Sequence, residues 1–290
     1  MVLKKLFGGS KKELAEEDYT IEDLFVLERY EEAASRLKDR LKGYPQDLHA
    51  HLRLADVYIQ LRQLPQAVEE YIYVAEEYAD DGFFDKGLAL LFKVQKLVTM
   101  DENLPLKIEK IRARKRIEAL REQALEGLRE GMGGGRGGTS ALELQGMWGQ
   151  LLRSKVVQML TGDQLKRLFS AMTLQPIEEG HVLAERNSDQ QELFLIVRGE
   201  VEASASVGAG PPVQIRLFGP GDVVGEASVL ERKPWPASYV AVSDVRVLRL
   251  TREGLEKAMV GSDDPRAIIG ALREQQHDRE VVEAILKLAQ

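Results

Sequence analysis

Two kinds of hydrophobic periodicity divide the chain. Up to about residue 130, apolar residues recur at three- and four-residue intervals, which is the pattern of amphipathic helices. Residues 141–172 continue this helical pattern. Residues 193–197 are apolar at every position, which predicts a strand that is buried on both faces. A helical pattern returns from Pro265 to the end, so the expected order is helices, then short strands, then helices.

A four-position template is repeated in the first helical region. Apolar or small residues stand at relative positions 0, 3, 9 and 12. The three sets are Ile21, Leu24, Tyr30 and Ala33; Ala55, Tyr58, Leu64 and Ala67; and Ala75, Tyr78, Phe84 and Gly87. The second set follows the first after one tetratricopeptide period, which is about 34 residues. The third set begins well before another full period has passed. We therefore expect the helix near Leu64–Ala79 to take part in two units.

The region from about residue 14 to 101 resembles tetratricopeptide repeats. Small residues at template positions, such as Ala67 and Gly87, let neighbouring helices approach closely. Pro45 follows the first unit, where it ends a helix. A further helix over about Leu104–Arg129 is expected to cap the last repeat. Its basic side chains are interleaved with acidic ones, which is typical of a solvated helix face.

The second half shows the two-residue alternation of short strands. Val201 and Ala203 alternate with acidic residues, and the apolar positions resume over 213–217 after a loop rich in glycine and proline. Valines and leucines over 240–250 predict the last strands. Thr251 is expected to cap a helix over Leu255–Met259.

These patterns define the expected fold and its boundaries. The fold class is α+β with two domains, an α-solenoid followed by an antiparallel β jelly-roll or barrel flanked by helices. Residues 12–130 form the repeat domain with its capping helix. Residues 131–140, which read GMGGGRGGTS, form a flexible linker, because glycine cannot hold a helix. Residues 141–290 form the second domain.

Composition excludes several functions. The chain has 290 residues, 44% of them hydrophobic and 30% charged, as in folded proteins. Its net charge of −7 argues against nucleic-acid binding. The absence of cysteine rules out thiolate chemistry and fits a cytoplasmic protein. No run approaches the ~20 apolar residues of a membrane span. His49 and His51 are two apart on a helix and make a poor metal pair, so no metal is expected.

The segment Phe218–Asp244 carries the candidate binding chemistry. Residues 219–221 predict a turn, followed by a short strand at 223–224 and a helical turn that opens with Gly225, Glu226 and Ala227. A glycine there lets backbone N–H groups approach a phosphate, and the next carboxylate can accept a hydrogen bond from a ribose hydroxyl. The pattern therefore suits a sugar phosphate.

Here the chain resembles the cyclic-nucleotide-binding domain of catabolite-activator-type transcription factors and protein kinase regulatory subunits. The resemblance spans about residues 154–273. It is carried by Glu179-Gly180, by Val197–Val201, by Phe218–Asp222 with Gly225–Ala227, and by Pro234, Ala237, Ser238 and Asp244-Val245. It implies that Glu226 is the ribose-binding acid. The family's phosphate-binding arginine would fall at Trp235, and Pro236 stands where the family has a small residue with a backbone N–H.

This departure leaves three hypotheses open for the second domain. A missing arginine removes charge-assisted hydrogen bonds of ~1.5–3 kcal/mol each. The domain is then a degenerate interaction or dimerisation module, with the Pro-Trp-Pro loop plugging the ligand space. Alternatively it binds a cyclic nucleotide, with Arg232 or Lys233 supplying the charge and Trp235 stacking on the base. Binding of a different anion or a dinucleotide in a reshaped pocket is the third hypothesis. The ligand residues, if function is retained, are Gly225, Glu226, Ala227, Arg232, Lys233, Trp235 and Ser238.

The sequence predicts a non-enzymatic regulatory adaptor of bacterial type. Its helical repeats are expected to bind protein partners, and its second domain to sense a ligand or to serve as the degenerate module. A cyclic nucleotide is the candidate ligand, no other cofactor is expected, and a homodimer through the C-terminal helices is an open alternative. The stretch that follows Arg273 is too short for a DNA-reading module. The runner-up is a cyclic-nucleotide-responsive regulator with atypical binding.

Overall fold

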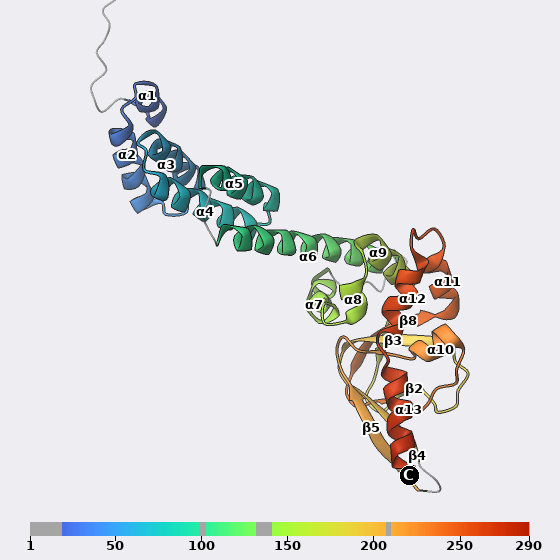
Figure 1. Ribbon diagram of the computed structural model, residues 1–290. Helices are drawn as coiled ribbons and strands as arrows, with labels where there is room; N and C mark the ends of the chain where they lie inside the picture. Colours follow the sequence, from blue (N-terminus) through green and yellow to red (C-terminus); the bar gives the residue numbers. More distant parts are fainter. Residues whose placement is uncertain (1–18, 99–102, 132–140, 207–209, 290) are drawn as a thin grey trace, which may run out of the picture. The chain divides into compact units, whose positions relative to one another are not determined.

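The computed structural model describes residues 19–98, 103–131, 141–206 and 210–289 (Figure 1). The chain divides into two compact units, Met1–Arg116 and Ile117–Gln290. This division falls within one long helix, α6 (Leu104–Gly131), rather than at its end. Of the linker proposed from sequence, Gly131 is the last residue of α6, and 132–140 lie outside the described residues. None of the helices in the described ranges has the length and apolar character needed to cross a membrane.

The first unit is a row of antiparallel helices. They are α1 (Ile21–Val26), α2 (Tyr30–Gly43), α3 (Leu48–Gln60), α4 (Leu64–Asp80), α5 (Phe84–Leu97) and the start of α6. Consecutive helices from α1 to α5 pack on one another, so α4 packs on both α3 and α5. Their buried residues form one core, which includes Leu24, Ala33, Ala55, Tyr58, Ala67 and Ala75 from the repeated template, together with Leu104, Ile108 and Ile111 of α6.

The turns between these helices repeat with the same spacing as the sequence template. Glu28, Arg62 and Gly82 each have a positive φ, of 57°, 57° and 84°. After each of them, the next residue's N–H donates to a carbonyl five residues earlier, as from Gln63 to Tyr58 at 2.8 Å. The three turns are separated by the same two intervals as the three template sets. The expectation that α4 serves two helix-turn-helix units is therefore confirmed.

Gly87 shows why the template requires small residues. A Cβ atom at Gly87 would lie 2.7 Å from the carbonyl oxygen of Ala75 on the neighbouring helix. Since a backbone oxygen cannot move aside as a flexible side chain does, only glycine fits at this approach of α5 to α4.

The second unit consists of two four-stranded antiparallel sheets and surrounding helices. One sheet has the order β1-β8-β3-β6 and the other β2-β7-β4-β5. The strands are β1 (Thr173–Ile177), β2 (Val182–Ala184), β3 (Glu192–Arg198), β4 (Val201–Ser206), β5 (Pro212–Phe218), β6 (Val223–Val224), β7 (Ser238–Ala241) and β8 (Val245–Thr251). The helices are α7 (Ala141–Leu151), α8 (Lys155–Met159), α9 (Gly162–Ser170), α10 (Glu226–Glu231), α11 (Arg252–Met259), α12 (Pro265–Arg273) and α13 (His277–Leu288). The predicted fold class is confirmed, although the sheets remain two and do not close into a barrel.

Strand β3 separates two cores, as its unbroken apolar pattern predicts. Leu193, Leu195 and Val197 face a core shared with the second half of α6 and with helices α7–α9, α11 and α12. Phe194 and Ile196 face a second core, between the sheets, which we call the sheet core. Trp235, Tyr239, Phe218 and Val281 of α13 belong to the sheet core.

Two details differ from the sequence pattern. Two apolar residues of β5 lie outside the core, with Val213 and Leu217 46% and 43% exposed, although Phe218 at the end of this edge strand is fully buried. Strands β1 and β2 were not predicted.

The predicted cap is confirmed, since the Thr251 hydroxyl accepts a hydrogen bond from the Gly254 N–H at 3.1 Å.

Candidate functional site

The segment after β5 folds as the sequence predicts. Gly221 has a φ of +100° in the turn before β6, and the Gly219 N–H donates to the Asp222 carboxylate at 2.9 Å. Gly225 follows β6 with a φ of +87° and is the N-cap residue of α10. The predicted order of turn, short strand, glycine and helical turn is confirmed.

The protein's own packing gives a reason for glycine at position 225. A Cβ there would lie 2.4 Å from the Trp235 indole and 2.5 Å from the carbonyl oxygen of Glu192. Neither group can withdraw, because Trp235 is buried and the carbonyl is part of β3. The groups that approach the Gly225 backbone closely are therefore Trp235 and the Glu192 carbonyl of this chain, where the sequence predicted a phosphate.

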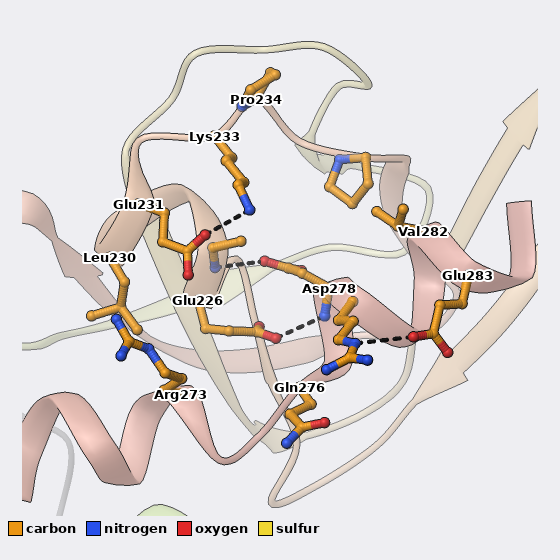
Figure 2. A pocket seen from close by; sticks show the side chains of 13 residues that line it. Glu226, Leu230, Glu231, Lys233, Pro234, Arg273, Gln276, Asp278, Val282 and Glu283 are labelled. Carbon is orange, nitrogen blue, oxygen red and sulfur yellow. Dashed lines mark hydrogen bonds and ion pairs between the residues drawn. The ribbon is translucent and has the colours of Figure 1, made fainter. Parts of the chain in front are cut away.

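A carboxylate from the C-terminal helix occupies the N–H groups around Gly225, and Figure 2 shows this group, Asp278, beside Glu226. Asp278, near the start of α13, accepts hydrogen bonds from the N–H of Gly225 at 3.2 Å and of Ala227 at 2.9 Å. It also accepts one from the Tyr239 hydroxyl at 3.2 Å. In return, the Asp278 N–H donates to Glu226 Oε1 at 2.7 Å. Each carboxyl group is thus bound to the backbone of the other's helix.

Burial perturbs both acids, and the charge of Asp278 perturbs Glu226 further. Glu226 is 5% exposed and Asp278 is 2% exposed. Burial, followed by the negative charge of Asp278, raises the pKa of Glu226 from 4.5 to about 8. Burial also raises the pKa of Asp278, although its N–H donors oppose the shift. The second oxygen of Glu226, Oε2, is buried and has no hydrogen-bond partner among the described residues.

The remaining predicted ligand residues do not converge on one point. Trp235 is 1% exposed, packs against Phe194 and Tyr239, and donates from its indole nitrogen to the Gln190 carbonyl at 2.8 Å. Arg232 follows α10 with a left-handed backbone, and its side chain is exposed. Lys233 pairs with Glu231 at 2.7 Å, and Ser238 Oγ accepts a hydrogen bond from the Arg186 N–H at 3.2 Å.

A cavity of about 550 Å³ lies between α10, the loop after it, and helices α12 and α13 (Figure 2). Of the predicted residues it is lined by Glu226, Ala227 and Lys233; the others do not line it. The other lining residues are Leu230, Glu231, Pro234, Pro236, Arg273, Gln276, Asp278, Arg279, Val282 and Glu283. The cavity wall carries both signs of charge and an apolar side formed by prolines and Val282.

Sequence reasoning missed Asp278, Arg273 and Arg279. All three come from the C-terminal helices, far along the chain from Gly225. For Asp278 and Arg279 the only local signal is an amphipathic helix with acidic residues in its first turn, and for Arg273 it is a basic residue in the last turn of α12. In the described part of the chain, no group of three or more His, Asp or Glu side chains is placed to hold a metal ion.

Two family models match the chain. Residues 26–83 match the tetratricopeptide repeat, a shorter stretch than the 14–101 expected from sequence, and residues 174–261 match the cyclic nucleotide-binding domain. The chain thus combines tetratricopeptide-like repeats with a cyclic nucleotide-binding domain, and the predicted resemblances are confirmed. Both families are regulatory or interaction domains rather than catalytic ones.

Curated proteins and solved structures are similar to part of the chain. The chain is 33% identical over 85 residues to the cAMP-dependent protein kinase regulatory subunit of Aspergillus fumigatus, covering 29% of this chain and 20% of that one. It is 26% identical over 84 residues to the CRP-like cAMP-activated global transcriptional regulator of Mycobacterium tuberculosis, covering 28% of this chain and 38% of that one. A solved cyclic nucleotide-binding domain from Methylobacillus flagellatus has a TM-score of 0.43 at 21% identity, covering 48% of this chain and 83% of that one. The chain therefore spans about a fifth to two fifths of these curated relatives.

Proposed function

We propose that this protein is a non-enzymatic regulatory adaptor. Its helical repeats bind protein partners, and its second unit is a cyclic-nucleotide-type domain that acts as an interaction module with its ligand position filled by its own side chains. The observation that carries this proposal is the placement of Trp235 and Asp278. Trp235 is 1% exposed within the sheet core, and Asp278 occupies the N–H groups of Gly225 and Ala227.

The chemistry of the loop supports the same conclusion. Proline at 236 has no N–H to donate, and no arginine stands where the family resemblance expects one. Losing one or two charge-assisted hydrogen bonds lowers the binding affinity for a phosphate ligand by roughly tenfold to several thousandfold. Arg232 and Lys233 do not replace the missing charge in this conformation, because Arg232 is exposed and Lys233 pairs with Glu231.

A second candidate function is a cyclic-nucleotide-responsive regulator with atypical binding. The cavity beside Glu226 favours it, since it has space for a small molecule and is lined by two arginines of the C-terminal helices, Arg273 and Arg279. In this candidate the phosphate charge is met from α12 and α13 rather than from the loop after α10. The substitution Arg273→Ala would then lower nucleotide affinity, whereas the adaptor proposal expects no affinity to lose.

The adaptor proposal is tested by cross-linking the full chain to its partners in cells, followed by mass spectrometry. We expect cross-links to partner proteins on residues of the repeat unit, and we expect added cyclic AMP or cyclic GMP to leave the pattern unchanged. Partner cross-links confined to residues 117–290 would contradict the role of the repeats. A pattern that changes with cyclic nucleotide would favour the second candidate.

A further inference from the structure

The contact between α10 and α13 has an unusual composition. Two buried carboxyl groups face each other, and each is bound to the backbone of the other's helix: Asp278 to the N–H of Ala227, and Glu226 to the N–H of Asp278. Two carboxylates that share one site cannot both ionise easily in a buried position, because the repulsion is poorly screened. One proton held by the pair removes this repulsion.

The hydrogen bonds show which group carries the proton. Asp278 accepts three donors, the N–H of Gly225, the N–H of Ala227 and the hydroxyl of Tyr239, so its negative charge is well stabilised. Glu226 accepts one donor on Oε1, and its buried Oε2 has none among the described residues. The proton therefore lies on Glu226, whose pKa of about 8 keeps it neutral at neutral pH.

The charged groups around the pair do not hold this proton in place of Glu226. The elements packed against it carry Asp222, His277, Arg216, Glu280, Glu231, Lys233, Arg273, Arg279 and Glu283. Arg216 pairs with Glu280, Lys233 with Glu231, and Arg279 with Glu283. His277 donates from Nδ1 to the Val223 carbonyl. Burial lowers the pKa of its imidazole from 6.5, so His277 loses its proton at a lower pH than Glu226 does. Tyr239 stays neutral, because burial raises the pKa of its hydroxyl further above 10.

The position of the pair lets it control α13. Gln276, directly before α13, has a positive φ of 55° and marks a sharp turn after α12. About one helical turn after Asp278, Val281 of α13 is fully buried in the sheet core with Trp235. Undocking of α13 would uncover this core and open the cavity whose wall α13 forms. The Glu226–Asp278 contact lies between the hinge and the buried valine.

We propose that Glu226 and Asp278 form a proton-linked latch, which holds α13 against the sheet core while the pair keeps its proton and releases α13 once the proton is lost. Docking raises the proton affinity of Glu226, so the stability that the pair gives to the docked state is fully present at acid pH, below 4.5, and is lost as pH rises towards about 8. The docking equilibrium falls by about tenfold per pH unit in this window. The latch belongs to the second unit and does not depend on the adaptor role.

The test is amide hydrogen exchange of the full chain between pH 5.5 and 8.5, with each rate divided by the intrinsic rate at the same pH. We expect protection of α13 to fall by at least tenfold across this range, while β3 and β8 stay protected. Glu226→Gln keeps the hydrogen-bond acceptor but cannot ionise, so its α13 protection should not change with pH. Glu283→Gln, an exposed acid on the same helix, is the matched control and should behave as the unmodified chain.

A second variant covers the case in which Glu226→Gln does not fold. Asp278→Asn removes the charge that repels Glu226 and offers only one acceptor to the two N–H groups. We expect its α13 protection to be lower already at pH 5.5, with a smaller fall at higher pH. The proposal is overturned if the unmodified chain shows the same α13 protection at every pH, or if both variants lose protection with pH as the unmodified chain does. Neither result bears on cross-linking of partners to the repeats.

Discussion

The substitution Gly225→Ala probes the crowding at the candidate site most sharply. It places a Cβ where the Trp235 ring and the Glu192 carbonyl oxygen lie 2.4 and 2.5 Å away. It also imposes an L side chain on a backbone with φ of +87°. Gly180→Ala is the matched control, because Gly180 has a similar φ of +82° but no atom within 4 Å of the added carbon.

The magnitude follows from separating these two effects. The left-handed conformation costs an alanine about 1–2 kcal/mol, and this cost is common to both variants. Overpacking against groups that cannot withdraw adds about 1–3 kcal/mol. We therefore expect a loss of about 2–5 kcal/mol for Gly225→Ala and about 1–2 kcal/mol for Gly180→Ala.

Urea denaturation of the full chain, followed by tryptophan fluorescence, measures both losses. The two tryptophans, Trp148 and Trp235, lie in the second unit and are 6% and 1% exposed, so the signal reports the unfolding of that unit. The packing explanation is wrong if Gly225→Ala is no more destabilising than Gly180→Ala. Glycine would then be needed at position 225 for another reason, such as the approach of a ligand.

Three further substitutions test other parts of the structure. Trp235→Ala should cost about 3–5 kcal/mol by the Trp148 signal, because a large buried ring is lost; a loss below about 1 kcal/mol would argue against a plug. Gly87→Ala should destabilise the repeat unit by about 1–3 kcal/mol in far-UV circular dichroism, whereas Gly43→Ala, which meets no neighbour, should not. Burial raises the pKa of Glu192, but its hydrogen bonds with Arg249 and Gln190 outweigh this and lower it, so their stabilisation is present above pH 4.5 and is lost in acid. Arg249→Met should cost about 1–3 kcal/mol at neutral pH and less at pH 3, and equal losses at both would contradict this assignment.

Periodic features of the chain were predictable from sequence. The unequal spacings of the three template sets identified the helix-turn-helix units and the double role of α4, because each set marks the positions where two helices pack closely. The cap at Thr251 and the strand over 193–197 were also predictable, since each depends on a short local pattern. Strands β1 and β2 were not, because β1 contains Pro176 and β2 has three residues.

The occupancy of the candidate site could not be predicted from local patterns. Glu226 was identified from its neighbours, but its partner Asp278 is 52 residues away on a helix whose docking the sequence does not specify. The direction of the Trp235 indole was likewise open, because both a plug and a stacking platform fit a Pro-Trp-Pro loop. Tertiary contacts decide both questions.

In the proposed function, this chain's own side chains occupy the nucleotide position of the second unit. Thermal unfolding of the full chain at neutral pH, with cyclic AMP or cyclic GMP at millimolar concentration, tests this occupancy. A ligand at 100 times its dissociation constant adds ~2.7 kcal/mol of stability, which moves the unfolding temperature of a unit of this size by several degrees. We expect no shift with either nucleotide. A saturable rise in unfolding temperature with one of them would show that the site is open to nucleotide and would contradict this occupancy.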